Sequence, residues 1–233
     1  MAPAKSTTRE RIIQAAVELF YAHGYAGTGM AEILKKAEAN SGSFYFFFTS
    51  KEDLLMAVLD WYQQSLGPVL LGPVFKQSKD PIKRIFLLLE KYRQSVVMTE
   101  FAFGCPLGRL ALEIEPDRRA VHDKIAANFT GWSRAVEELL TEAHAAGRLP
   151  QDCDLRQLSR FVLTVMEGGV MQARSYQCIE PFDDCIAQLR QYFKTLECSK
   201  TKASGHARRA VAQKSASATT PQKLPSETKR RRK

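Results

Sequence analysis

The chain has 233 residues, of which 45% are hydrophobic and 25% are charged, so it is long enough to bury a core. No apolar run reaches the roughly 18 residues that a membrane span needs, and the amino terminus lacks the apolar segment of a signal peptide. The five cysteines form no C-x-x-C pair, which argues against a zinc module or a disulfide scaffold. We therefore expect a cytoplasmic protein with no membrane partner, no metal and no cofactor.

The net charge of +9 is unevenly distributed along the chain. Residues 199–233 carry eleven Lys and Arg and one acidic residue, whereas residues 1–198 carry 23 basic and 24 acidic side chains. The basic character thus comes from the tail, and it is no evidence that the preceding part binds nucleic acid. Since the tail is nearly free of large apolar residues, we expect it to be disordered.

The first expected helix covers residues 7–23. Thr7 is a candidate N-cap, and Glu10 three residues later completes a capping box. Gly24 is expected to end this helix, because glycine accepts the left-handed conformation common after a last turn. A second helix is predicted to begin at Thr28, with apolar residues at helical spacing behind it.

A third, short helix is expected over residues 41–48, with Asn40 as its N-cap. A fourth starts after Ser50 and is predicted to stop at Gly67-Pro68. The second and third helices are separated by only three or four residues, which is the length of the turn in a helix-turn-helix. A small helical bundle of another kind fits this spacing equally well.

The rest of the chain is also predicted to be helical, without strand alternation. Helices are expected over residues 82–98, 107–114, 116–146, 154–176 and 181–197. The last one has apolar residues at 4-3-4-3 spacing, a heptad pattern suited to packing against a partner helix: Phe182, Ile186, Leu189, Phe193 and Leu196.

Residues 28–55 decide between the two interpretations of the amino-terminal helices. The stretch reads TGMAEILKKAEANSGSFYFFFTSKEDLL, and it resembles the tetracycline-repressor (TetR) family in four fixed-spacing features. These are Thr28, Gly42, the pair Phe44-Tyr45, and Phe48 followed by Ser50-Lys51-Glu52. The resemblance covers residues 6–66 and implies an all-α protein: a three-helix helix-turn-helix domain at 6–66, a larger helical ligand-binding and dimerisation domain at 67–198, and the tail at 199–233.

The sequence departs from the family pattern at three positions. Glu38 stands where the family usually has a glycine in the turn, and a left-handed backbone there would cost a glutamate about 1 kcal/mol. Phe47 replaces a common histidine, and Ser41 replaces a common basic residue. We therefore expect a slightly strained or differently shaped turn.

Eight residues are predicted to contact DNA, because the amino end of a recognition helix enters the major groove. They are Thr28, Asn40, Ser41, Gly42, Ser43, Tyr45, Phe46 and Lys51. Asn40, Ser41 and Ser43 are candidates for base edges or phosphates, while Gly42 allows close approach. The resemblance assigns phosphate contacts to Thr28, Tyr45 and Lys51; a base in the first turn of a helix is otherwise unfavourable. Asn40 as a simple cap, and Phe46 or Phe47 as core, remain alternatives.

The carboxyl-terminal domain is expected to dimerise and to hold an effector, as the resemblance implies. The pocket candidates are large flexible or aromatic residues and one thiol: Met98, Phe101, Phe103, Cys105, Trp132 and Met166. Most residues of these types are simply core. A cysteine at a helix start, as Cys105 is predicted to be, has a lowered pKa and suits sensing of oxidants or electrophiles; an inert buried thiol is the alternative.

No enzyme motif is present, since the four histidines are scattered singly and no phosphate-binding glycine loop occurs. The sequence therefore predicts a non-enzymatic transcriptional repressor that binds a palindromic operator as a dimer and is released by an unknown small molecule. A non-specific DNA-binding protein that acts through the basic tail is the competing hypothesis.

Overall fold

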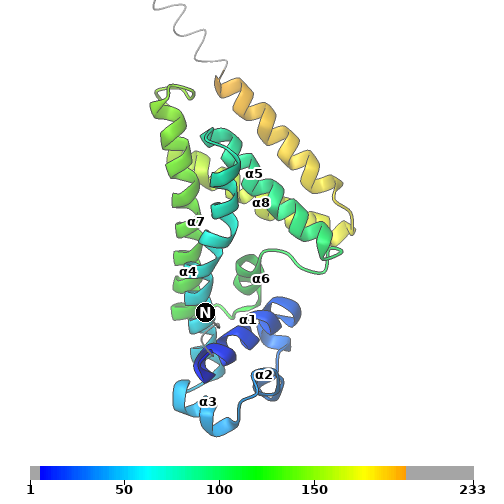
Figure 1. Cartoon of the computed structure of the whole chain (residues 1–233). Coiled ribbons are helices and arrows are strands. Elements are labelled where there is room, and N and C mark those ends of the chain that lie inside the picture. The colour runs from blue at the N-terminus through cyan, green and yellow to red at the C-terminus, as the bar shows by residue number, and fades with distance from the viewer. Residues whose placement is uncertain (1–5, 198–233) are drawn as a thin grey trace, which may run out of the picture.

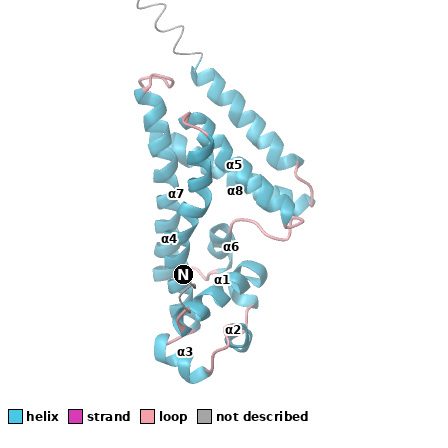
Figure 2. Cartoon of the chain, in the orientation of Figure 1, coloured by secondary structure: helices cyan, strands magenta, loops and turns pink. Residues whose placement is uncertain are grey.

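The computed structural model describes residues 6–197, and this part of the chain is entirely helical (Figures 1 and 2). The predicted all-α class is confirmed. The helices are α1 (Thr8–Gly27), α2 (Met30–Lys36), α3 (Ser41–Phe47), α4 (Lys51–Gln77), α5 (Pro81–Met98), α6 (Pro106–Glu113), α7 (Arg119–Ala145), α8 (Leu155–Tyr176) and a last helix over residues 180–197. The predicted disordered tail, 199–233, lies outside the described residues.

Side-chain caps start several of these helices where the sequence places them. Thr7 and Glu10 form the expected capping box at α1. The side chain of Asn40 accepts a hydrogen bond from the Ser43 amide at 2.8 Å and starts α3. Ser50 and Asp154 cap α4 and α8 in the same way. Each cap satisfies a backbone amide that the first helical turn leaves unpaired.

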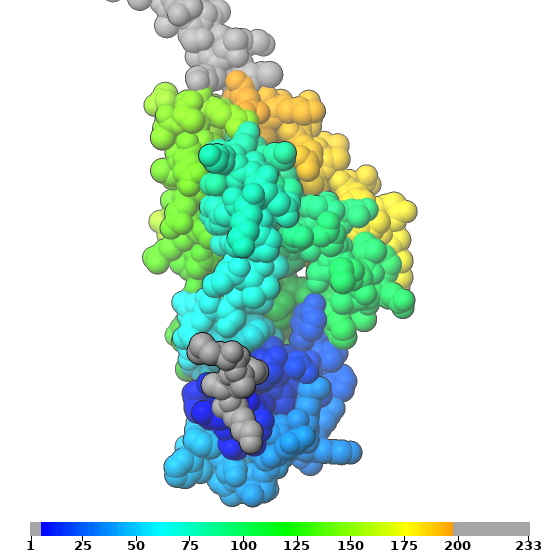
Figure 3. Space-filling model, viewed as in Figure 1, coloured from blue at the N-terminus to red at the C-terminus, as the bar shows by residue number. Residues whose placement is uncertain are grey.

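The helices pack around two clusters of buried apolar residues. The first joins α1, α2, α3 and the beginning of α4 to α6 and the first half of α7. The second joins α5, the second half of α7, α8 and the last helix. The long helices α4 and α7 contribute to both ends of the molecule, with α1–α3 gathered at one end (Figures 1 and 3). A displacement of α4 or α7 would therefore affect the packing of both clusters.

Helix α4 does not stop at Gly67-Pro68 as the sequence predicts, but continues to Gln77 through Pro68 and Pro73. Each proline removes one backbone hydrogen bond, which favours an end there. The helix continues because Val74 is fully buried and Leu70 and Leu71 pack against the second core. The free energy gained by burying these side chains outweighs the lost hydrogen bonds. The expected domain boundary between residues 66 and 67 therefore falls inside α4.

Two other helix starts differ from the expectation. Helix α2 begins at Met30 rather than Thr28, because the Thr28 hydroxyl is engaged in closing the end of α1. Helix α7 begins at Arg119 rather than Pro116. The intervening residues form a turn in which Arg118 pairs with Glu52 at the start of α4.

The heptad stripe of the last helix faces its own chain. Phe182, Leu189 and Phe193 are buried in the second core, and Ile186 and Leu196 pack at its edge. The stripe therefore packs against other helices of the same chain. Within residues 6–197, no helix is long and apolar enough to cross a lipid bilayer.

Candidate nucleic-acid interface

Helix α3 is anchored by one face and exposed on the other. Phe44 and Phe48 are buried in the first core. Tyr45 and Phe46 are 69% and 81% exposed, so two large aromatic side chains project into solvent. Contact of large aromatic side chains with water is unfavourable, and binding of a partner that covers them would remove this cost.

The polar residues at the amino end of α3 accompany these aromatics on the surface. Asn40, Ser41 and Gly42 are exposed and Ser43 is half-buried. A side chain added at Gly42 would meet only the Asn40 side chain, so the backbone there is open to approach. These residues, Asn40 to Phe46, extend along almost the whole of α3, and their contacts with DNA remain a prediction.

The turn before α3 has the strained backbone that the sequence analysis anticipates. Glu38 has φ = 49°, the left-handed region in which glycine is favoured. The amides of Glu38 and Ala39 bond to the carbonyls of Lys35 and Leu34, which is the Schellman arrangement that ends α2. Arg11 from α1 donates to the carbonyl of Ala37 at 3.0 Å and fixes the turn against α1. Sequence reasoning gave Arg11 no role, because its partner is 26 residues away.

Thr28 is 1% exposed, and its hydroxyl donates to the carbonyls of Gly24 at 2.7 Å and Leu19 at 3.2 Å. A side chain engaged in this way has no hydrogen left for a phosphate. Any contact of Thr28 with DNA is therefore limited to its backbone.

Lys51 is the second predicted phosphate contact that has an internal partner. Its Nζ donates to the carbonyl of Tyr25 at 2.5 Å and lies 4.4 Å from the centroid of the Tyr25 ring. Partial burial lowers the pKa of Lys51, and the nearby Glu113 carboxylate opposes this shift. In this conformation Lys51 ties the start of α4 to the end of α1.

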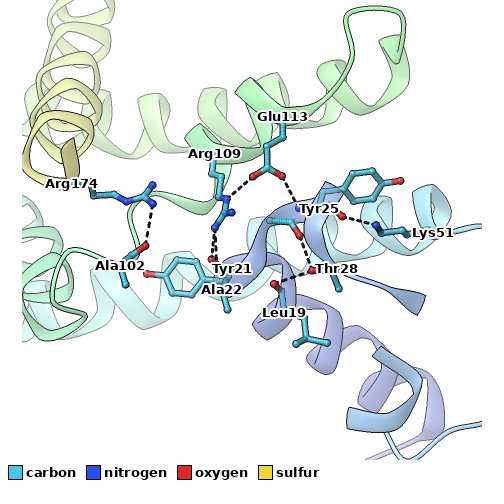
Figure 4. Close-up of polar contacts among 11 residues, drawn as sticks. Leu19, Tyr21, Ala22, Tyr25, Thr28, Lys51, Ala102, Arg109, Glu113 and Arg174 are labelled. Atoms are coloured by element: carbon cyan, nitrogen blue, oxygen red, sulfur yellow. Dashed lines mark hydrogen bonds and ion pairs between the residues drawn. The ribbon is translucent and has the colours of Figure 1, made fainter. Parts of the chain in front are cut away.

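A group of charged contacts, which we call the α6–α1 clasp, holds the end of α1 (Figure 4). Glu113 accepts a hydrogen bond from the Tyr25 amide at 2.7 Å and pairs with Arg109 at 2.5 Å. Arg109 donates in turn to the carbonyls of Tyr21 and Ala22. Two side chains of α6 therefore satisfy backbone groups on both sides of a break in α1.

Gly24 makes this break possible. Its φ of 80° and ψ of 169° interrupt α1, although the helix resumes to Gly27. A Cβ atom there would collide with the Glu113 carboxylate and the Arg109 guanidinium. The position requires glycine for its positive φ and for the close approach of the clasp.

The contacts continue from the clasp toward α8. Arg174 of α8 donates to the carbonyl of Ala102 at 3.1 Å (Figure 4). It also donates to the carbonyl of Phe101 at 3.4 Å. Residues 99–105 connect α5 to α6, and Glu100 and Phe101 have positive φ in this connection. Polar contacts thus link α8 to the connection before α6, and α6 to the end of α1. The end of α1 is followed by α2 and is bonded to the start of α4 through Lys51.

The six predicted pocket residues do not line one cavity. Met98 is 83% exposed at the end of α5. Met166 is buried in the second core. Phe103 contacts the Tyr21 ring, and Trp132 lines a small cavity of about 120 Å³ between α4 and α7. Phe101 packs against the second core.

An apolar cavity of about 250 Å³ lies between α1, α4, α5 and the start of α6. Its lining includes the neighbours of the predicted Cys105, namely Gly104 and Pro106. Sequence reasoning missed the tyrosines on its walls, since Tyr21, Tyr62 and Tyr92 are far apart in the chain. Only the packing of three helices brings them together.

Cys105 is the N-cap of α6, as expected of a residue at a helix start, but it is buried. Burial raises the pKa of the Cys105 thiol well above its usual value, and the adjacent Glu167 carboxylate raises it further. The expected lowering of this pKa is therefore wrong. A helix start lowers a thiol pKa only where water or cations stabilise the thiolate, and here a carboxylate faces it.

Comparison with known proteins gives two family matches. The model for the tetR family of bacterial regulatory proteins matches residues 12–58, and the model for a tetracyclin repressor-like C-terminal domain matches residues 81–189. The chain is 28% identical to the transcriptional regulator AcuR of Cereibacter sphaeroides, covering 83% of this chain and 89% of AcuR. It is 24% identical to the transcriptional repressor DhaR of a Mycobacterium species, covering 78% and 90%.

One similar solved structure includes DNA. It is a cysteine mutant of the TetR-family regulator CifR in complex with 26-base-pair operator DNA. The identity is 26% and the TM-score is 0.67, over 81% of this chain and 98% of that chain.

Proposed function

Because this chain belongs to the TetR family of transcriptional regulators, we propose that it is a repressor that binds a palindromic operator as a homodimer and leaves it when a small-molecule effector binds. Members of this family regulate transcription by binding DNA and are not enzymes. We assign DNA recognition to residues 6–66, and effector binding and dimerisation to residues 67–198. As its DNA partner is chromosomal, the proposed location is the cytoplasm.

The exposed amino end of α3 is the observation that carries this proposal. Asn40, Ser41 and Ser43 offer hydrogen-bonding groups beside the exposed Tyr45 and Phe46. A capped helix end with free amides and small polar side chains suits the floor of the major groove. The operator complex of CifR, a protein of similar fold, supports DNA as the partner.

Dimerisation is supported by a half-exposed apolar surface beside the buried heptad stripe. Phe161 of α8 and Tyr192 of the last helix are both nearly half exposed, and their rings pack edge to face at 5.7 Å. Two such surfaces meeting about a two-fold axis would bring two α3 helices to one operator. Their separation must be near one turn of DNA, about 34 Å, or a multiple of it.

The α6–α1 clasp supplies the proposed coupling between the two parts. An effector that fits better when α6 has shifted favours the population in which the clasp has moved. Tyr25 and Lys51 then move together, because the Lys51 ammonium is bonded to the Tyr25 carbonyl. This motion changes the placement of α4 and of α3 before it, and so the spacing of the dimer.

The experiment that tests the proposed function is operator binding by fluorescence anisotropy at about 150 mM salt, where weak phosphate contacts are screened. The DNA upstream of the gene is compared with random DNA of the same length. We expect a preference of at least about 100-fold for the upstream DNA, within the usual range for specific binding. Tyr45→Ala is expected to remove this preference.

The matched control is Tyr176→Ala, because Tyr176 is as exposed as Tyr45 but lies at the end of α8. It is expected to keep the preference. Equal binding of both DNAs, lost only when residues 199–233 are deleted, would instead support the alternative of a non-specific DNA-binding protein that acts through the basic tail.

A cysteine-based sensor remains a second candidate, favoured by one observation. Cys105 caps α6, the helix whose Arg109 and Glu113 form the clasp, so modification of its thiol would disturb the clasp directly. Its raised pKa requires opening of the site before reaction. The test is release of operator DNA by N-ethylmaleimide, which Cys105→Ser abolishes if the sensor hypothesis is correct.

A further inference from the structure

The 250 Å³ cavity between α1, α4 and α5 is small and mostly apolar. Its walls are Trp61, Leu66 and Leu70 of α4, Val96 of α5 and Val17 of α1, with three tyrosines among them. It is below the usual size of sites for drug-sized molecules, so its occupant must be small. The cavity touches α1 directly, three residues before the Gly24 break.

The lining offers no counter-charge to a charged ligand. Among the lining residues there is no lysine, arginine or histidine, and Glu18 is the only acidic residue. Glu18 pairs with Lys36 at 2.8 Å and accepts a hydrogen bond from Gln14. An ionic ligand would lose its hydration without an oppositely charged partner, which disfavours its binding.

Tyr62 presents a hydroxyl that has no partner. The residue is 3% exposed, and its Oη forms no hydrogen bond within the part of the chain that the structure describes. Tyr62 lines this cavity and also the smaller cavity between α4 and α7. Burial raises the pKa of Tyr62, so the hydroxyl keeps its proton and is a donor.

The other two tyrosines of the cavity, Tyr21 and Tyr92, differ from Tyr62 in the surroundings of their hydroxyls. The hydroxyl of Tyr21 is already hydrogen-bonded to Ser95. Tyr92 also contributes a protonated hydroxyl, since burial raises its pKa well above the usual value. A buried donor without an acceptor is unfavourable, and a ligand that brings an acceptor removes this penalty.

We propose that this cavity binds a small, uncharged organic molecule that carries a carbonyl-type hydrogen-bond acceptor, and that Tyr62 donates the hydrogen bond that selects it. The inference rests on the proposed function, because it gives the chemical class of the effector. Tyr21 connects the ligand to the DNA-binding end: its side chain lines the cavity, and its carbonyl accepts a hydrogen bond from Arg109 of the clasp.

The test is isothermal titration calorimetry of the full-length chain without DNA. The probes are acetophenone, ethylbenzene, benzoate and benzylammonium, which share a ring and differ in acceptor and charge. Acetophenone is expected to bind about tenfold more tightly than ethylbenzene, the effect of one hydrogen bond to a buried donor. Benzoate and benzylammonium are expected to bind more weakly than ethylbenzene.

Variants separate the role of Tyr62 from the shape of the cavity. Tyr62→Phe is expected to lower acetophenone affinity about tenfold and to leave ethylbenzene affinity unchanged. Tyr21→Phe is the matched control, because the same change is made in the same cavity to a hydroxyl that already has a partner. It is expected to preserve the preference for acetophenone. Thermal melting confirms that both variants fold.

Three results would overturn the inference: tightest binding of a charged probe, an acetophenone preference that Tyr62→Phe leaves intact, or no binding of any probe. Operator binding is measured separately in the presence of acetophenone. If acetophenone binds in a Tyr62-dependent way but operator affinity does not change, the ligand class is supported. The same result contradicts only the proposal that this ligand releases the operator.

Discussion

At the scale of single residues, two glutamates are in energetically unfavourable local states. Glu38 has a left-handed backbone conformation, yet the Schellman hydrogen bonds of α2 and the contact of Arg11 with Ala37 hold it there. Glu167 is a largely buried acid whose Oε1 has no partner in the described part of the chain. Glu38 lies in the turn before α3, and Glu167 lies next to Cys105 at the start of α6.

Glu38→Gly is expected to raise the free energy of unfolding by up to about 1 kcal/mol, because glycine has no Cβ to strain at φ = 49°. Urea denaturation measures this change. Gln64→Gly, an exposed position inside α4, is the control and is expected to lower stability by about 1 kcal/mol. Destabilisation by both variants would mean that the turn is not strained.

Glu167 predicts a pH dependence of stability. Burial raises the pKa of its carboxyl above the ordinary value of 4.5, and the hydrogen bond with Cys105 opposes this. The folded chain therefore binds this proton more tightly than the unfolded chain does. The contribution of Glu167 to the free energy of unfolding is most favourable below about pH 4.5, and it is lost as the pH rises through the pKa of the folded chain.

Glu167→Gln removes this ionisation. The stability of the variant relative to the native chain is expected to increase between about pH 4.5 and pH 8, as urea denaturation at several pH values can measure. The exposed Glu138→Gln on α7 is expected to change stability little. A difference for Glu167→Gln that shrinks with rising pH would contradict the assignment.

At the scale of elements, helix ends decide how the DNA-binding part is placed. The Gly24 break lets α1 turn, and α6 clasps the backbone on both sides of it. Helix α4 carries Lys51 at one end, and toward its other end Leu70 and Leu71 pack against the second core. These two connections, one through α6 and one along α4, are the routes by which the helical C-terminal part can move α3.

Glu113→Gln is expected to lower the free energy of unfolding by about 1–3 kcal/mol, because Arg109 then loses its counter-charge in a mostly buried site. Faster hydrogen exchange of the Tyr25 amide should accompany this loss. Glu115→Gln is the matched control: Glu115 is a highly exposed partner of Arg118, and such pairs contribute below about 1 kcal/mol. Equal effects of the two variants would argue against the clasp.

At the scale of the whole molecule, two cores share the long helices α4 and α7, with the exposed end of α3 at one extreme. The apolar stripe of the last helix is buried within the chain. The surface left for a second copy is therefore the exposed side of α8 and the last helix, where Phe161 and Tyr192 pack together.

Phe161→Ser is expected to weaken dimerisation at least about tenfold, as loss of an aromatic anchor at the centre of an interface does. Sedimentation equilibrium of the full-length chain measures this effect, and operator affinity should fall with it. The control is Leu112→Ser, because Leu112 is a highly exposed apolar residue on α6, away from this surface. A Phe161→Ser chain that dimerises normally would exclude this surface as the interface.

The sequence alone determined the features that depend on nearby residues. The capping box at Thr7 and the Asn40 cap were predictable, because their causes lie within a few positions along the chain. The motif at residues 28–55 identified the family for the same reason. The turn at Glu38 was expected to be either strained or differently shaped, and the choice between Phe46 and Phe47 as the exposed residue stayed open.

Only the tertiary structure decided the features that depend on distant partners. The Lys51 ammonium meets the Tyr25 carbonyl, Glu113 reaches an amide 88 residues away, and α4 continues past Pro68 because a distant core buries Val74. Cys105 has a raised rather than a lowered pKa because its thiol is buried and Glu167 of α8 lies next to it. Helical periodicity tells which face of a helix is apolar, but packing decides which other helix covers that face and which charges meet there.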